Sequence, residues 1–178
     1  MTTRTSGSMV HGVRFGAALG AAVVSAIQIL TWVGLGLTVW TWISSYLLVV
    51  LFTALAGRAF LKRGSSPPGM VQTLLMVTAM VFVAKVMFQT YMFVYLNYVD
   101  PTWVETVAEF WEGQMRESGT DEERIVANIS DFRNQWRTRY IFTIGIVRYS
   151  VTELVLGTVS ALVSMSITAK WRARTMAD

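Results

Sequence analysis

Two ionisable residues, Lys85 and Glu153, each lie in the middle of a long apolar stretch of the sequence. Charged side chains are costly in lipid, so they usually have a partner or take part in moving protons or ions. If the two stretches are antiparallel helices, residue counting places both charges at nearly the same depth. The sequence therefore predicts a Lys85–Glu153 ion pair. It could form part of a proton or ion path, or it could lock two helices together.

Other chemistry has few candidates. The chain has no cysteine and a single histidine, which excludes disulfides, thiolate metal sites and sites built from several imidazoles. His11 could be an axial ligand to haem or chlorophyll magnesium, or it could contact lipid headgroups. Arg148 could reach the membrane surface and meet a lipid phosphate or an acid on a partner chain. No phosphate loop, nucleophile elbow or metal-ligand cluster is recognisable. We therefore expect no enzymatic activity, no metal and no intrinsic cofactor, with bound lipids and a pigment contact as the remaining options.

The elements that position these residues follow from composition. The chain of 178 residues is 53% hydrophobic and 15% charged, below the quarter typical of soluble domains. We expect one all-α integral membrane domain over residues 1–178, because isolated segments in lipid must satisfy their backbone groups internally. Four segments have the length needed to span a bilayer. They run over about 15–33, 39–60, 70–96 and 140–168.

The first of these segments resembles a cleavable secretory signal, because Arg4 and Arg14 precede an apolar run that ends in "VVSA". We expect it to be retained as a transmembrane helix.

Charge asymmetry predicts the orientation. The amino-terminal tail, the link between the second and third spans and the carboxy-terminal tail are strongly basic, whereas the long segment before the fourth span is acidic. The basic residues are Arg4, Arg14, Arg58, Lys62, Arg63, Lys170, Arg172 and Arg174. Basic flanks stay in the cytoplasm, so we expect both termini there, in a bacterial inner membrane. Sorted in this way, the net charge of +4 indicates a membrane topology and no nucleic-acid partner.

Tryptophans gather at the predicted outer boundary, where indole rings prefer the headgroup region. They are Trp32, Trp40, Trp42, Trp103, Trp111 and Trp136. This pattern is typical either of an ordinary aromatic belt or of a surface that binds other proteins.

The outer segment, about 100–138, predicts two amphipathic helices that lie along an interface or pack on a partner. Asp100-Pro101 is a favourable helix start. The sequence "ESG" ends the first helix, and Thr120 with Glu123 has the spacing of a capping box for the second.

Small residues predict two faces for close helix packing. Gly12, Gly16 and Gly20 form a double GxxxG pattern in the first span. In the fourth span Gly157, Ser160 and Ser164 share a helical face with Glu153. Each face could serve contacts within the bundle or attachment to another subunit.

The sequence "YLNYVDPTWVETVAEFWEGQMRESGTDEER" resembles an uncharacterised bacterial family of small four-helix membrane proteins, known as a domain of unknown function. The resemblance implies the four-helix topology and the paired outer helices, and it implies no activity.

We therefore expect a structural accessory subunit that braces its neighbours in a larger membrane complex. Photosynthetic and respiratory energy-converting assemblies are the class of machine that recruits such subunits. The alternative is a small homo-oligomeric transporter or channel that uses Lys85 and Glu153.

Overall fold

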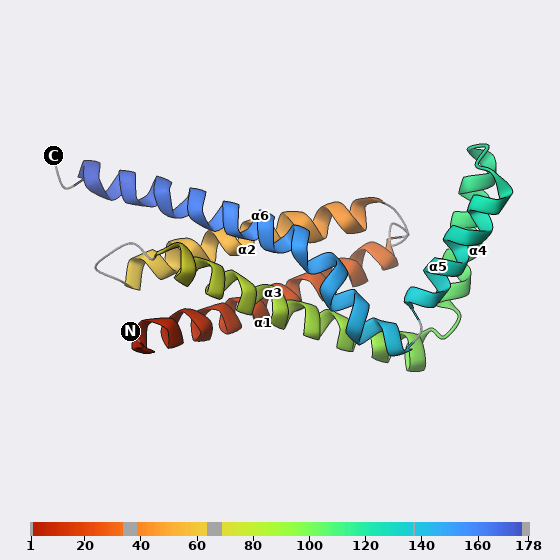
Figure 1. The fold of residues 1–178 in the computed structure, drawn as a ribbon, viewed down its shortest axis with the longest axis horizontal. Coiled ribbons are helices and arrows are strands. Elements are labelled where there is room, and N and C mark those ends of the chain that lie inside the picture. The colour runs from red at the N-terminus through yellow and green to blue at the C-terminus, as the bar shows by residue number, and fades with distance from the viewer. Residues whose placement is uncertain (1, 34–38, 64–68, 137, 176–178) are drawn as a thin grey trace. The chain divides into compact units, whose positions relative to one another are not determined.

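The computed structural model describes residues 2–33, 39–63, 69–136 and 138–175, with side chains over 7–33, 41, 43–62, 69–134, 136 and 151–170. Along these residues the chain forms six α-helices, one π-helical turn and no strand (Figure 1). The helices are α1 (Thr2–Trp32), α2 (Val39–Arg63), α3 (Met70–Val94), α4 (Trp103–Glu117), α5 (Glu122–Gln135) and α6 (Thr138–Thr175), and the π-turn η1 (Tyr95–Val99) follows α3.

Four of the helical segments are long and apolar enough to cross a membrane: Gly7–Trp32, Ile43–Lys62, Met70–Val99 and Val151–Lys170. The number of spans agrees with the sequence prediction, but the helices α1 and α6 extend well beyond the predicted apolar stretches. A helix continues through polar residues when no proline interrupts it, and the prolines of this chain lie at Pro67, Pro68 and Pro101. The third span ends in the π-turn, where the Asp100 amide donates to the Tyr95 carbonyl.

Residues 1–88 and 149–178 form one compact unit, and residues 89–148 form a second. In the first unit, α1 packs against α2 and α3, and α6 packs against the same two helices (Figure 1). Its core consists of apolar side chains from all four helices, including Leu19, Val49, Met76, Met80 and Ala161. The start of α1, the end of α2, the start of α3 and the end of α6 lie at one end of this unit.

The second unit contains the hairpin of α4 and α5, whose apolar faces pack on one another. Ala108, Ile125 and Ile129 are buried there, with Met115 and Phe132 against them. Gly119 has a φ of 74° and allows the chain to reverse after α4. The helix thus ends at the sequence "ESG", as predicted.

The helix starts of this hairpin differ in part from the prediction. The Asp100 carboxylate accepts hydrogen bonds from the Thr102 amide and hydroxyl, as the predicted capping of free amides requires. However, α4 begins at Trp103 with Thr102 as its N-cap, so Pro101 lies before the helix and does not occupy its first position. The prediction of a Thr120–Glu123 capping box was wrong, because the N-cap of α5 is Asp121, which makes no side-chain capping bond. Thr120 instead contacts Ser118, with 3.1 Å between the hydroxyl oxygens, in the turn that Gly119 shapes.

Candidate functional site: a buried ion pair within the helix bundle

The first unit brings the two intramembrane charges together. Nζ of Lys85 in α3 lies 2.7 Å from Oε1 of Glu153 in α6. The side chains are 13% and 11% exposed, so both charges are largely buried inside the bundle. A short pair with little exposure strengthens the Coulomb attraction between the partners, and this attraction offsets the cost of desolvating them.

Gly157, one turn after Glu153, lets α6 approach two other helices closely. A Cβ added at Gly157 would lie 3.0 Å from the side chains of Thr53 in α2 and Val77 in α3. The Thr53 hydroxyl is itself turned inward, donating to the Val49 carbonyl at 2.7 Å. This close approach fixes the height of α6, and therefore of the Glu153 carboxylate, against α3.

The rest of the predicted small-residue face of α6 forms polar bonds to α2. Ser160 Oγ donates to the Val50 carbonyl at 2.8 Å, and Ser164 Oγ donates to the Ala54 carbonyl at 3.0 Å. Arg58 Nε in turn donates to Ser164 Oγ at 3.1 Å. This face is therefore used within the chain, in contact with α2.

The glycines of α1 likewise pack within the chain, against α3. A Cβ added at Gly16 would lie 2.6 Å from the Met80 carbonyl oxygen, and one at Gly20 would lie 2.9 Å from Met87 Sδ. A Cβ at Gly12 would collide with the Met76 carbonyl oxygen. The sequence left open whether these glycines pack within the bundle or attach to another subunit, and the structure shows that they pack within the bundle.

His11 is a core residue, which corrects the predicted role in ligand or headgroup contact. Its side chain is 2% exposed, and Nε2 lies 3.1 Å from the carbonyl oxygen of Ala56 in α2. The imidazole also packs between the rings of Phe15 and Phe60, with centroids 4.7 and 5.5 Å away. The prediction was wrong because residues 2–14 continue the helix, which carries His11 into the contact between α1 and α2.

The sequence matches the family described as "Protein of unknown function (DUF4199)" over residues 14–166. The chain belongs to the DUF4199 family. Comparisons with curated proteins and with solved structures found no match. The match contains both members of the ion pair, and the DUF4199 family has no assigned activity.

The predicted outer anchors of this DUF4199 protein have different surroundings. Trp32 is 79% exposed and Trp111 is 40% exposed. Trp103 and Trp136 contact each other edge to face at 5.4 Å, which joins the start of α4 to the end of α5. The side chains of Trp40, Trp42 and Arg148 lie outside the described residues.

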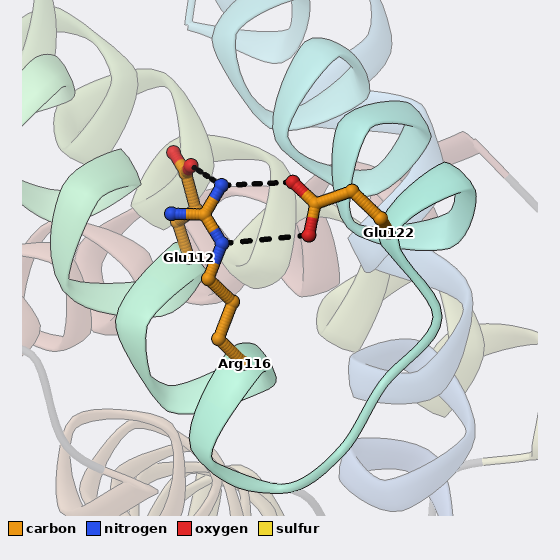
Figure 2. Close-up of polar contacts among 3 residues, drawn as sticks. All are labelled: Glu112, Arg116 and Glu122. Carbon is orange, nitrogen blue, oxygen red and sulfur yellow. Dashed lines mark hydrogen bonds and ion pairs between the residues drawn. The ribbon is translucent and has the colours of Figure 1, made fainter.

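Two ion pairs connect α4 and α5. Near the turn, the Arg116 guanidinium binds Glu122 through two nitrogens and also pairs with Glu112, 2.8 Å away (Figure 2). Toward the other end of the hairpin, Arg133 pairs with Glu105 at 2.8 Å. The hydrogen bond and positive charge of Arg116 lower the pKa of Glu122, and the same contacts raise the pKa of Arg116.

Sequence reasoning missed two parts of the helix-packing site. Gly57 approaches the Ala161 carbonyl so closely that an added Cβ would lie 3.0 Å away, and its spacing of four from Thr53 was an available signal. Arg58 was interpreted only as a basic flank, although it binds Ser164. Gln89 shares a helical face with Lys85, as its spacing of four residues predicts; it is buried, and its Oε1 accepts no hydrogen bond from the described residues.

The described side chains offer little for metal or cofactor chemistry. Over these residues no three His, Asp or Glu side chains gather in a way that could hold a metal ion. Described residues line a groove in each unit, and neither Lys85 nor Glu153 lines either of these two grooves.

Proposed function

We propose that the protein is a structural accessory subunit of a larger membrane assembly, in which it braces neighbouring subunits. The observation that carries the proposal is the closed Lys85–Glu153 pair. A charge that carries a proton or an ion must change partners during transport, whereas here each charge already has a partner 2.7 Å away inside the chain. The pair is therefore suited to holding α3 and α6 in one arrangement.

The neighbouring polar contacts support the same role. Ser160, Ser164 and Arg58 bind groups within the bundle, and the close glycine contacts bring backbones together. Helix association in lipid depends on such packing and on interhelical hydrogen bonds. These contacts favour a rigid body whose remaining contacts are made by its outer surface.

Helix α6 offers an outer surface of this kind. Every fourth residue along it is an exposed β-branched side chain, and the series runs Val151, Val155, Val159, Val163 and Ile167. Residues four apart lie on one face of a helix, so these side chains form a continuous apolar ridge. We assign this ridge to a neighbouring subunit, and in isolated protein it would face lipid.

We further infer that the end of the first unit where α1 begins faces the cytoplasm of a bacterial cell, and that α4 and α5 lie on the opposite side of its inner membrane. Arg14, Arg58, Lys62 and Lys170 are exposed near the first of these ends. The α4–α5 segment carries most of the acids of the chain. Basic flanks remain cytoplasmic during insertion, and this bias supports the orientation.

Site-specific crosslinking tests the bracing role. A photo-reactive amino acid placed at Val155 or Val159 in native membranes should crosslink to one defined membrane protein, with one copy of this chain per complex. The matched control is Leu51, an exposed apolar residue of α2. If mild detergent releases the protein alone and monomeric, and the ridge positions crosslink only to lipid, the bracing proposal is wrong.

The alternative is a small homo-oligomeric transporter or channel. The buried charges favour it, and so does the Gln89 oxygen, which accepts no hydrogen bond from the described residues. A proton-flux assay in liposomes distinguishes the two functions. Flux that Glu153→Gln abolishes, in a variant that still folds and assembles, would establish transport in place of bracing. If neither the wild-type protein nor the Glu153→Gln variant shows flux, and a membrane protein co-purifies in a fixed ratio, the result would support the bracing role.

A further inference from the structure

The first unit contains a groove of about 710 Å³ at the end where α1 begins and α2 ends. Phe15 from α1, Leu55 and Ala59 from α2, and Ile167 and Thr168 from α6 line it. Arg58 and Lys62 of α2 also line it, and both are exposed. The accessible lining is almost entirely apolar, so Arg58 and Lys62 contribute to it mainly through the aliphatic parts of their side chains.

The two cations share one face of α2, because they are four residues apart. Arg58 is held in place, since its Nε donates to Ser164 Oγ and Ser164 in turn donates to the Ala54 carbonyl. A guanidinium fixed through Nε still has its terminal nitrogens as donors for an oxyanion. Lys62, one turn closer to the end of the span, adds a second charge at the same rim.

No acid within the described part of the first unit balances these charges. Glu153 is the only acidic residue there, and it is bound by Lys85. Arg58 and Lys62 form no ion pair with the described residues. An apolar groove with two cations that no described acid balances, at the end of a membrane span, is complementary to a molecule that has a negative headgroup and a hydrocarbon chain.

We propose that this groove binds one anionic phospholipid, with its phosphate at Arg58 and Lys62 and an acyl chain against Phe15, Leu55, Ala59 and Ile167. Basic pockets between membrane helices recognise anionic headgroups in this way. The site shares Ile167 with the end of the α6 ridge, but the other lining residues do not belong to that ridge, so lipid binding can be tested separately from the bracing role. It assigns a specific lipid class to one face of the molecule.

Native mass spectrometry of the full-length, delipidated protein tests the proposal. Titration with phosphatidylglycerol should show one tightly retained copy, whereas phosphatidylcholine should bind more weakly. The substitutions R58Q and K62Q should each weaken phosphatidylglycerol binding by roughly fivefold. The matched control is R14Q combined with K170Q, which removes two exposed charges that do not line the groove. The control should leave binding unchanged.

A second variant tests the apolar part of the groove. A59F would enlarge an apolar lining residue while leaving both cations in place, and it should reduce phosphatidylglycerol binding without changing binding of inorganic phosphate. Circular dichroism and size-exclusion chromatography confirm that each variant folds. Three results would each overturn the proposal. They are equal affinity for the two lipids, a loss of binding in the R14Q/K170Q control as large as in R58Q or K62Q, and unchanged lipid binding by A59F.

Discussion

Lys85 Nζ and Glu153 Oε1, 2.7 Å apart, join the middle of α3 to α6 where both side chains are nearly withdrawn from the surface. The energetic value of such a contact depends on what remains when one partner is removed. Removing one partner leaves a buried charge unpaired, which is strongly destabilising. Replacing both partners by apolar residues of similar size changes the stability much less. This asymmetry gives a direct test of a structural role.

We predict that Lys85→Met or Glu153→Leu alone destabilises the bundle by about 3 kcal/mol, because each removes one member of a buried ion pair and leaves the charge of the other. The double substitution should recover most of this loss. Unfolding in mixed detergent micelles measures the effect. Arg133→Gln is the control, because the Arg133–Glu105 pair is largely exposed and should contribute less than about 1 kcal/mol. Additive losses in the double variant would contradict the prediction.

The glycine stripe of α1 predicts a second result. In Gly16→Ala the new methyl would lie 2.6 Å from the Met80 carbonyl oxygen, so α1 and α3 must move apart. We expect a loss of about 1–3 kcal/mol, the usual effect of overpacking. Gly7→Ala is the control, because nothing lies within 4 Å of an added Cβ there and alanine favours helix. Equal stability of the two variants would show that the close contact is absent.

The sequence predicted the elements that depend on local chemistry. Long apolar runs predicted four membrane-spanning helices, and matching depth brought Lys85 and Glu153 together as expected. Small residues at Gly16 and Gly157 correctly indicated close approach. The sequence could not show which helix each glycine faces, because that depends on the rotation of α1 and α6 in the assembled bundle.

The errors arose at polar helix ends. Residues 2–14 were treated as a tail because they are polar, yet a helix needs only unbroken backbone bonding, and so His11 was assigned to the surface instead of the core. The Thr120–Glu123 spacing matched a capping box, but the chain reversal at Gly119 makes Asp121 the N-cap instead. Neither outcome depends on the residue types alone, because long-range packing and backbone geometry decide both.

The turn between α4 and α5 predicts a pH effect. The guanidinium of Arg116 lowers the pKa of Glu122, so the contribution of this pair to folding is complete above the unfolded pKa of about 4.3. It is lost as the pH falls through the lower folded pKa. Arg116→Gln should return the Glu122 pKa toward its ordinary value in a carboxyl-carbon NMR titration of the full-length protein. The Glu122 pKa should be unchanged in Arg133→Gln. A higher Glu122 pKa in that variant would show that the general charge of the hairpin matters more than the Arg116 contact.

The buried imidazole gives the last prediction. His11→Ala removes the ring between Phe15 and Phe60 together with the contact to the Ala56 carbonyl, so it should destabilise the first unit by about 2–4 kcal/mol. His11→Gln places an amide nitrogen near the position of Nε2, and we expect it to recover part of the loss. Thermal unfolding of both variants in detergent measures the difference. A histidine at the membrane surface would tolerate alanine with a change below about 0.5 kcal/mol, and that result would contradict its placement between α1 and α2.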